Sequence, residues 1–94
     1  MRLSDHEKHI ILEAVAAEDA TARVFVFGSR ANDSSKGGDI DLLIVSKNFT
    51  KQNVRNTRWR IQEQLGEQKI DIVTTKDGHE SFVQLIQPQA QELA

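Results

Sequence analysis

The sequence predicts an α/β (α+β) fold, in which helices pack on a small mixed sheet. Two observations predict it: helical and strand periodicities alternate along the chain, and helix caps or glycines mark where the segments change. The expected order is helix, strand, loop, strand, helix, strand, helix. Because 94 residues suffice for one domain only, we expect residues 1–94 to form a single domain.

The first helix is predicted from its cap and its apolar stripe. Ser4 is followed three residues later by Glu7, the spacing of a capping box. The apolar positions that follow recur at helical spacing: Ile10, Ile11, Ala14 and Val15. We expect this helix to end between residues 17 and 19.

Two strands and a loop follow. Residues 23–27 form a run of β-branched and aromatic side chains, which is typical of a buried strand, and the run ends at Gly28. Residues 29–38 are rich in Asn, Asp, Ser and Gly, so they are predicted to form a loop. Residues 39–45 are predicted to form the second strand.

The second half of the chain repeats this alternation. Thr50 is a candidate N-cap for a helix that continues to about Leu65, and Gly66 is a favourable stop. The core stripe expected on this helix is Val54, Ile61 and Leu65.

The remaining segments are shorter. Residues 69–75 are predicted to form a third strand, and residues 77–86 a short last helix that ends before Pro88. We expect the tail, residues 81–94, to be this helix and an arm that covers the small core.

Composition excludes several classes of function. Without cysteine, the chain has no disulfide, thiolate nucleophile or sulfur-based zinc site. Twelve Lys and Arg against fourteen Asp and Glu give a net charge of −2, which does not favour direct nucleic-acid binding. The longest apolar run, residues 40–45, is far short of the roughly 20 residues that span a bilayer. We therefore expect a cytoplasmic protein without a membrane segment.

Three aspartates interrupt otherwise apolar strands. Asp39 and Asp41 project to the same face, because strand residues two apart have α-carbons about 6.6 Å apart on one side. Asp71 interrupts the third strand and supplies a third carboxylate if that strand lies beside the second. Carboxylates this close repel each other, and a hard divalent cation between them relieves the repulsion. The alternative is that they are solvated side chains at a strand edge.

The preceding turn favours the functional interpretation. The first strand ends in Gly28 and Ser29, and a loop of nine residues separates Ser29 from Asp39. Glycine allows a ligand to approach the backbone closely, and a serine after a strand presents N–H and hydroxyl donors to phosphate. Such a turn beside a carboxylate pair is suited to a metal-bound triphosphate.

These motifs resemble a known superfamily. Residues 27–31 and 38–42 are similar to the Gly-Ser and Asp-x-Asp signature of DNA polymerase β-like nucleotidyltransferases, and residues 70–73 match the position of the third aspartate. The likeness covers about residues 3 to 75. The length of the chain and its first residues resemble those of the minimal nucleotidyltransferases. In that group the domain is commonly the antitoxin partner of a HEPN-domain toxin. The resemblance implies the polymerase β-like fold.

The resemblance also implies a two-metal mechanism. Asp39 and Asp41 would hold two Mg²⁺ ions, about 3.5–4 Å apart in such sites, and Asp71 would share one of them and assist as a base. Gly28 and Ser29 would orient the triphosphate of ATP. Arg30 is a candidate for phosphate contact, and a surface salt bridge is the alternative.

The implied reaction transfers AMP from Mg-ATP to a hydroxyl of a cognate HEPN toxin in a hetero-oligomer, neutralising the toxin. The chain contains no tyrosine, so a tyrosine acceptor would lie on another protein. Two alternatives stay open. One is transfer to a small molecule or an RNA end, and the other is a non-catalytic antitoxin that neutralises by binding.

One helix carries features that the motif does not explain. No acidic residue occurs between Leu42 and Gln62, while five basic residues do: Lys47, Lys51, Arg55, Arg58 and Arg60. This run is either a solvated helix face or a docking surface for an acidic partner or phosphate. Trp59 lies off the expected core stripe and either packs at the sheet edge or anchors a partner.

Overall fold

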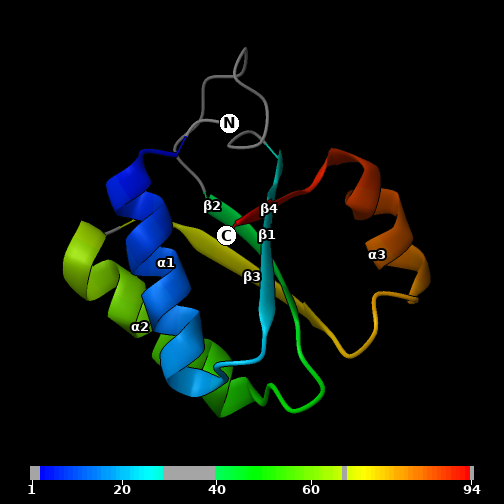
Figure 1. Ribbon diagram of the computed structural model, residues 1–94, viewed down its shortest axis with the longest axis horizontal. Coiled ribbons are helices and arrows are strands. Elements are labelled where there is room, and N and C mark those ends of the chain that lie inside the picture. The colour runs from blue at the N-terminus through cyan, green and yellow to red at the C-terminus, as the bar shows by residue number, and fades with distance from the viewer. Residues whose placement is uncertain (1–2, 29–39, 67, 94) are drawn as a thin grey trace.

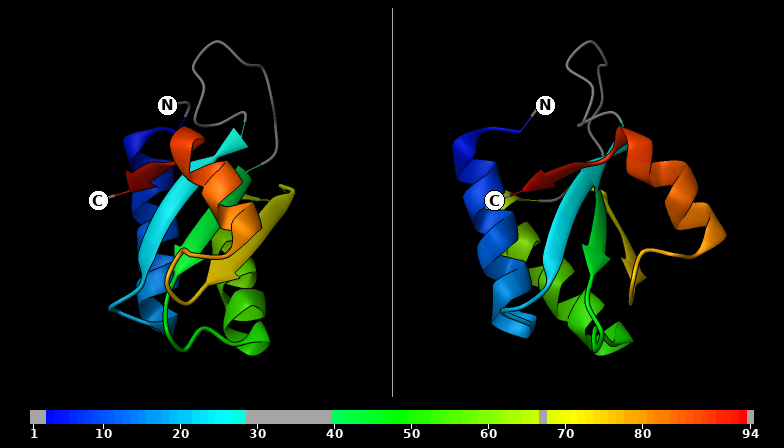
Figure 2. Two further views of the ribbon diagram at one scale, coloured as in Figure 1. Left: turned by 90° about the vertical axis from the view of Figure 1, so that its right-hand side faces the viewer. Right: turned by 45° about the vertical axis from the view of Figure 1, so that its right-hand side comes forward.

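The computed structural model describes residues 3–28, 40–66 and 68–93, which build three layers (Figure 1). The helices of these residues are α1 (Asp5–Glu18), α2 (Lys51–Leu65) and α3 (Ser81–Ile86), with a short 3₁₀ turn, η2 (Gln87–Gln89). The strands are β1 (Arg23–Phe27), β2 (Ile40–Val45), β3 (Ile70–Thr75) and β4 (Gln91–Leu93). Helices α1 and α2 lie on one side of the sheet and α3 lies on the other (Figures 1 and 2).

The sheet is mixed, as predicted, and its strand order is β3-β2-β1-β4. Strand β1 runs antiparallel to both β2 and β4, while β2 and β3 are parallel and are connected through α2. This small α+β architecture confirms the predicted fold class and is consistent with a polymerase β-like nucleotidyltransferase fold.

Both long helices begin as their caps predict. Ser4 Oγ accepts from the N–H of Glu7 at 3.1 Å, and Glu7 Oε1 accepts from the N–H of Ser4 at 3.0 Å. Thr50 and Asn53 form the same reciprocal pair at the start of α2. Gly66 ends α2 with a φ of 84°, a conformation that favours glycine. The predicted ends of α1 and α2 are therefore confirmed.

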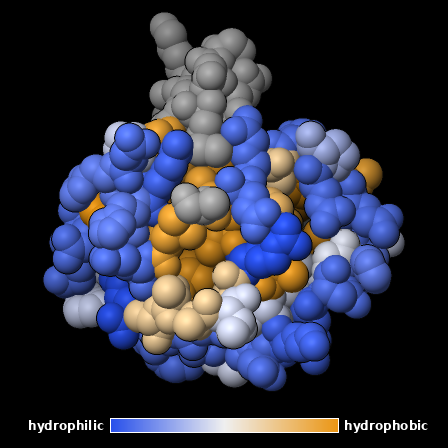
Figure 3. All heavy atoms as spheres, viewed as in Figure 1, coloured by the Kyte–Doolittle hydropathy of each residue, from blue (hydrophilic) through white to orange (hydrophobic). Residues whose placement is uncertain are grey.

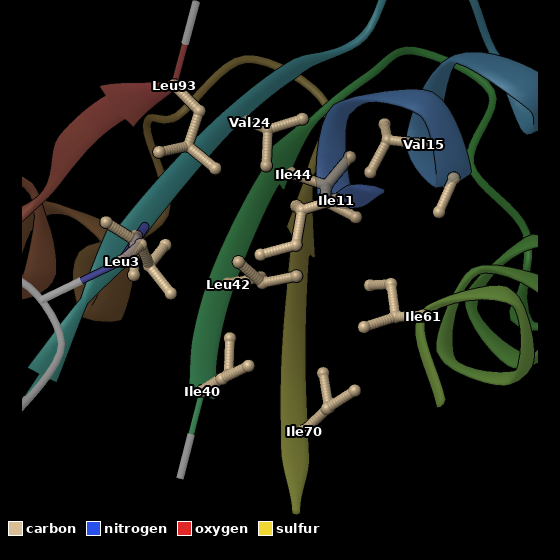
Figure 4. Packing of buried hydrophobic residues seen from close by; sticks show 12 residues of the cluster. Leu3, Ile11, Val15, Val24, Ile40, Leu42, Ile44, Ile61, Ile70 and Leu93 are labelled. Carbon is tan, nitrogen blue, oxygen red and sulfur yellow. The ribbon is translucent and has the colours of Figure 1, made fainter. Parts of the chain in front are cut away.

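The main core lies between the sheet and the α1–α2 layer (Figure 4). Alternate residues of each strand point into it, because strand side chains alternate between faces. Its fully buried members include Ile11, Val26, Ile40, Leu42, Ile44 and Ile61. On the opposite face, Leu43 of β2 and Val83 of α3 are also completely buried. Helix α3 therefore closes a second, smaller apolar layer.

The core stripe of α2 differs from the prediction. Ile61 is fully buried as expected and Leu65, although half-buried, packs against the core, whereas Val54 is only half-buried. Thr57 takes a fully buried position instead, and its hydroxyl has no hydrogen-bond partner among the described residues. A threonine scores as polar, so the apolar pattern alone could not place it in the core.

The C-terminal segment differs from the prediction in two respects. The predicted helix over residues 77–86 begins only at Ser81, because the chain bends at residues 76–78. In this bend Gly78 has a φ of 81° and its N–H donates to Thr75 Oγ1 at 2.9 Å. The expected arm is in fact a strand, β4, whose Leu93 is buried beside Val24.

A buried carboxylate joins the two long helices. Glu18, at the end of α1, has a side chain only 7% exposed. It accepts from Asn53 Nδ2 at 2.9 Å, Asn56 Nδ2 at 3.0 Å and Arg60 Nε at 3.3 Å. These hydrogen bonds, that of Asn53 first, hold the pKa of Glu18 below its usual value. Glu18 therefore supports folding in its ionised form.

The surface combines polar helices with an apolar centre. In the view of Figure 3, hydrophobic residues gather between α1 on the left and α3 on the right, and polar side chains surround them. Over the residues that the structure describes, no helix has the length and apolar character needed to cross a membrane.

Candidate active site

One end of the sheet collects the described residues of the predicted site. Because β1 is antiparallel to β2, its last residue, Phe27, lies opposite Asp41. Because β2 and β3 are parallel and in register, Asp41 in turn lies opposite Asp71. The turn after β1 and the first residues of β2 and β3 therefore meet at the same end.

The two carboxylates also share a face. Paired residues on neighbouring strands point to the same side of a sheet, with the strands about 4.8 Å apart. Asp41 and Asp71 are therefore adjacent on the face opposite α1 and α2. Asp41 is half-buried and Asp71 is exposed, so the pair opens from the sheet towards solvent. The sequence left open whether Asp71 would face Asp41, and the structure places them together.

Gly28 lies directly against the carboxylate of Asp41. Its φ is 70°, and a β-carbon built on it would be 2.4 Å from Asp41 Oδ2. Contacts of that length do not occur between unbonded carbon and oxygen, so any side chain at this position would collide with the carboxylate. The absence of a side chain at Gly28 thus lets the carboxylate of Asp41 lie against the backbone of the turn.

The remaining predicted site residues lie outside the described residues. These are Ser29, Arg30 and Asp39. Within residues 3–28, 40–66 and 68–93, no three His, Cys, Asp or Glu side chains come together as a complete metal-binding group. The described part of the site therefore consists of Gly28, Asp41 and Asp71.

The described donors fit a hard divalent cation. Carboxylate oxygens are the ligands that Mg²⁺ prefers, and it is usually bound by one or two carboxylates together with water and substrate phosphates. Asp41 and Asp71 supply two carboxylates from adjacent strands, and the carboxylate of Asp41 lies against the backbone at Gly28. The chemistry of the donor set is therefore suited to a metal-bound phosphate ligand.

Comparison with protein families identifies the domain. A family model described as a nucleotidyltransferase domain matches residues 8–92. The chain belongs to this nucleotidyltransferase domain family. A search of the curated proteins found no match to it. Family membership assigns a general nucleotidyl transfer activity, so this nucleotidyltransferase domain is a transferase.

The match extends beyond the motif residues. It begins within α1 and ends within β4, whereas the motif-based resemblance covers residues 3 to 75. The C-terminal helix and strand thus belong to the nucleotidyltransferase domain. The sequence did not predict the start of that helix or the presence of that strand. Within β4, Gln91 lies opposite Val26, so this strand pairs with β1 next to the end of the sheet that carries Gly28, Asp41 and Asp71.

The basic residues between Lys47 and Arg60 do not all lie on one face of the domain. Arg60 pairs with Glu18 at 3.3 Å, so it is used within the α1–α2 layer. Arg58 is half-buried and its Nε donates to the carbonyl of Ile70 at 3.2 Å, beside β3. Trp59 is 61% exposed, which excludes the interpretation that it is packed at the sheet edge.

Proposed function

We propose that this nucleotidyltransferase domain is an antitoxin that transfers AMP from Mg-ATP to a hydroxyl, with tyrosine as the expected acceptor, of a cognate HEPN-domain toxin. The observation that supports nucleotidyl transfer most directly is the pairing of Asp41 with Asp71 beside Gly28. The antitoxin role and the HEPN partner rest on the resemblance of the motifs to minimal nucleotidyltransferases.

Two Mg²⁺ ions would be held by Asp39, Asp41 and Asp71. When bound, such ions neutralise phosphate charge and lower the pKa of an attacking hydroxyl. Asp41 suits this role because it is half-buried and next to a second carboxylate, where a cation is attracted more strongly than in open water.

The chain's own residues orient and deprotonate the reactants in this proposal. Gly28 and Ser29 would bind the β- and γ-phosphates, and Arg30 would contact the same phosphates. Asp71 accepts the proton of the acceptor hydroxyl, whose oxygen bonds to the α-phosphorus as the bond from phosphorus to pyrophosphate breaks. Positioning and charge stabilisation supply most of the rate increase in such transfers.

The direct test is the mass of the partner. The protein is incubated with the product of the adjacent gene, the expected HEPN protein, in the presence of ATP and Mg²⁺, with both proteins folded. We expect one adenylyl group to be added to the HEPN protein. Peptide mass spectrometry should locate this group on a residue that carries a hydroxyl. An unchanged partner mass, with pyrophosphate released only when a small hydroxylated molecule or RNA is supplied, would favour the alternative substrates.

A double variant separates catalysis from binding. Asp39→Ala combined with Asp41→Ala removes two carboxylates from the proposed metal site. We expect the variant to bind the toxin but to leave it active. If the variant still neutralises the toxin, the protein acts by binding alone and the catalytic proposal is wrong.

A further inference from the structure

Strand β3 has an open outer edge. It is the border strand of the order β3-β2-β1-β4, and no described strand lies beyond it (Figure 2). The N–H of Ile40 donates to the carbonyl of Lys69, and the N–H of Ser46 donates to that of Thr75. Odd-numbered residues of β3 therefore bond to β2, so the N–H and C=O groups of Ile72 and Thr74 point outward.

No described residue forms a hydrogen bond with these outward N–H and C=O groups of Ile72 and Thr74. The outward carbonyl before them, in contrast, does accept a hydrogen bond. That carbonyl belongs to Ile70, and it accepts from Arg58 Nε at 3.2 Å. Since Ile72, Val73 and Thr74 are only half-buried, the edge is accessible to another chain. Unpaired N–H and C=O groups in a row are a template for strand addition.

A basic stripe on α2 runs beside this edge. We use the name α2 basic stripe for Lys51, Arg55 and Arg58, which lie on one side of the helix because they are four and three residues apart. The contact of Arg58 with Ile70 and that of Gln62 Nε2 with the carbonyl of Gln68, at 3.0 Å, show that this side faces β3. The stripe spans about 10 Å, close to the distance from Ile70 to Thr74 along the strand.

The stripe carries uncompensated positive charge. Within the part of the chain that the structure describes, none of its three cations has a carboxylate partner. Lys76, exposed at the end of β3, extends the positive charge. Asp71 is the one acidic residue of β3, and its side chain points to the opposite face.

From these two features we infer that the outer edge of β3 binds an acidic, extended polypeptide segment as an additional strand. Its backbone pairs with Ile72 and Thr74, and its Asp or Glu side chains, on every second residue, meet the α2 basic stripe. The open backbone favours a polypeptide over RNA, because a nucleic acid would use the cations but leave the N–H and C=O groups unpaired.

The inferred segment would also pass the candidate active site. Asp71 lies on the same strand, one residue before Ile72, so a strand paired with β3 would run close to it. If the acceptor is a protein, its acidic segment would deliver a nearby hydroxyl to this end of the sheet. Only this relation to the acceptor rests on the proposed function; the binding surface does not.

The test is selection from a library of random short peptides displayed on phage, with no nucleotide present. We expect enriched peptides to carry Asp or Glu at alternate positions. Enriched peptides are then synthesised, and their affinities are measured by fluorescence anisotropy for the wild-type protein and its variants. Methylating alternate backbone nitrogens of a peptide should abolish binding, because the strand pairing is lost while the charge is kept.

Two pairs of variants assign the surface. Thr74→Pro removes an outward N–H that β2 does not use, and we expect binding to weaken at least about fivefold, whereas Thr74→Val should leave it unchanged. Arg55→Glu should weaken binding about fivefold, and Lys8→Glu, on α1, should not.

Three results would overturn the inference. They are the absence of an acidic, alternating consensus, equal binding of the methylated peptide, and equal binding by Thr74→Pro. Preference for a single-stranded RNA pool over the selected peptides would assign the stripe to nucleic acid instead. Because no step requires ATP, a failure of nucleotidyl transfer leaves these results unaffected.

Discussion

The carboxylate of Asp41 lies where a side chain of Gly28 would otherwise be. A β-carbon on Gly28 would be 2.4 Å from Asp41 Oδ2 and 3.3 Å from its Cγ. Gly28 also has a φ of 70°, a backbone conformation that L residues with a side chain rarely adopt. Glycine at this position is thus required twice, once by the backbone conformation and once by the carboxylate.

Substituting Gly28 by alanine should damage both stability and function. We expect Gly28→Ala to cost about 1–2 kcal/mol from the strained φ and the displaced carboxylate, which corresponds to a Tm decrease of about 4–16 °C for a domain of this size. Transfer activity should fall about 100-fold, because displacement of a reacting group by 1 Å has that effect. Thermal unfolding and a pyrophosphate-release assay measure the two losses.

Gly66→Ala is the matched control. Gly66 also has a positive φ, 84°, but nothing lies within 4 Å of the β-carbon that alanine would add. We expect a similar backbone cost, about 1 kcal/mol, with activity unchanged. Equal loss of activity in both variants would show that strain, and not the contact with Asp41, is responsible.

Asp71 offers a test of cation binding that does not require the acceptor. Asp71 is exposed, so Asp71→Asn should change Tm by only a few degrees without metal. A ligand that binds only the folded state raises Tm, and Mg²⁺ or Mn²⁺ should therefore raise the Tm of the wild type. In Asp71→Asn we expect that increase to be largely lost.

The control is a substitution that removes the charge of a glutamate outside the candidate site. Glu63 is an exposed acidic residue of α2, away from the paired aspartates. Glu63→Gln should retain the full metal-dependent increase in Tm. An increase that persists in Asp71→Asn would exclude Asp71 as a ligand and leave Asp39 and Asp41 to hold the cation.

How much of the fold could be predicted depended on the strength of local signals. The capping boxes of Ser4 and Thr50 and the stop at Gly66 are local hydrogen-bond and backbone effects, so the sequence placed α1 and α2 correctly. Strand β4 has three residues, two of them charged or polar. Its pairing with β1 is a contact between distant segments, which no local pattern indicates.

The site was predictable in part for the same reason. Asp41 and Asp71 are conspicuous because each interrupts an apolar strand, and their residue types suggest a metal. Their adjacency depends on the parallel register of β2 and β3, which only the tertiary structure fixes. The predicted roles of Ser29, Arg30 and Asp39 remain predictions, since these residues lie outside the described part of the chain.

Glu18 should make stability depend on acid pH. Its pKa is lowered from 4.5 in the folded state, by the hydrogen bonds from Asn53 and Asn56 first. Below about pH 4.5 the unfolded chain therefore binds more protons than the folded one, so stability is present above this value and lost as pH falls through the lower folded pKa. Thermal unfolding between pH 7 and pH 3 measures this loss.

Glu18→Gln separates the contribution of this residue from that of other carboxylates. At pH 7 we expect the variant to be about 1–2 kcal/mol less stable, because hydrogen bonds to a charged acceptor are replaced by weaker ones. Between pH 4.5 and pH 3 its stability should fall less steeply than that of the wild type. Glu63→Gln should follow the wild-type curve, and identical slopes for all three proteins would contradict this origin of the acid sensitivity.

The C-terminal strand should contribute to stability in spite of its length. Leu93 is only 4% exposed and packs in the main core, whereas Leu85, on α3, is 76% exposed. Truncating a buried leucine removes its apolar contacts and leaves a cavity, so Leu93→Ala should cost about 2–3 kcal/mol and lower Tm by about 8–24 °C. Leu85→Ala, the same chemical change at the surface, should stay within about 0.5 kcal/mol of the wild type. Equal effects of the two substitutions in urea unfolding would show that β4 is not held against the core in solution.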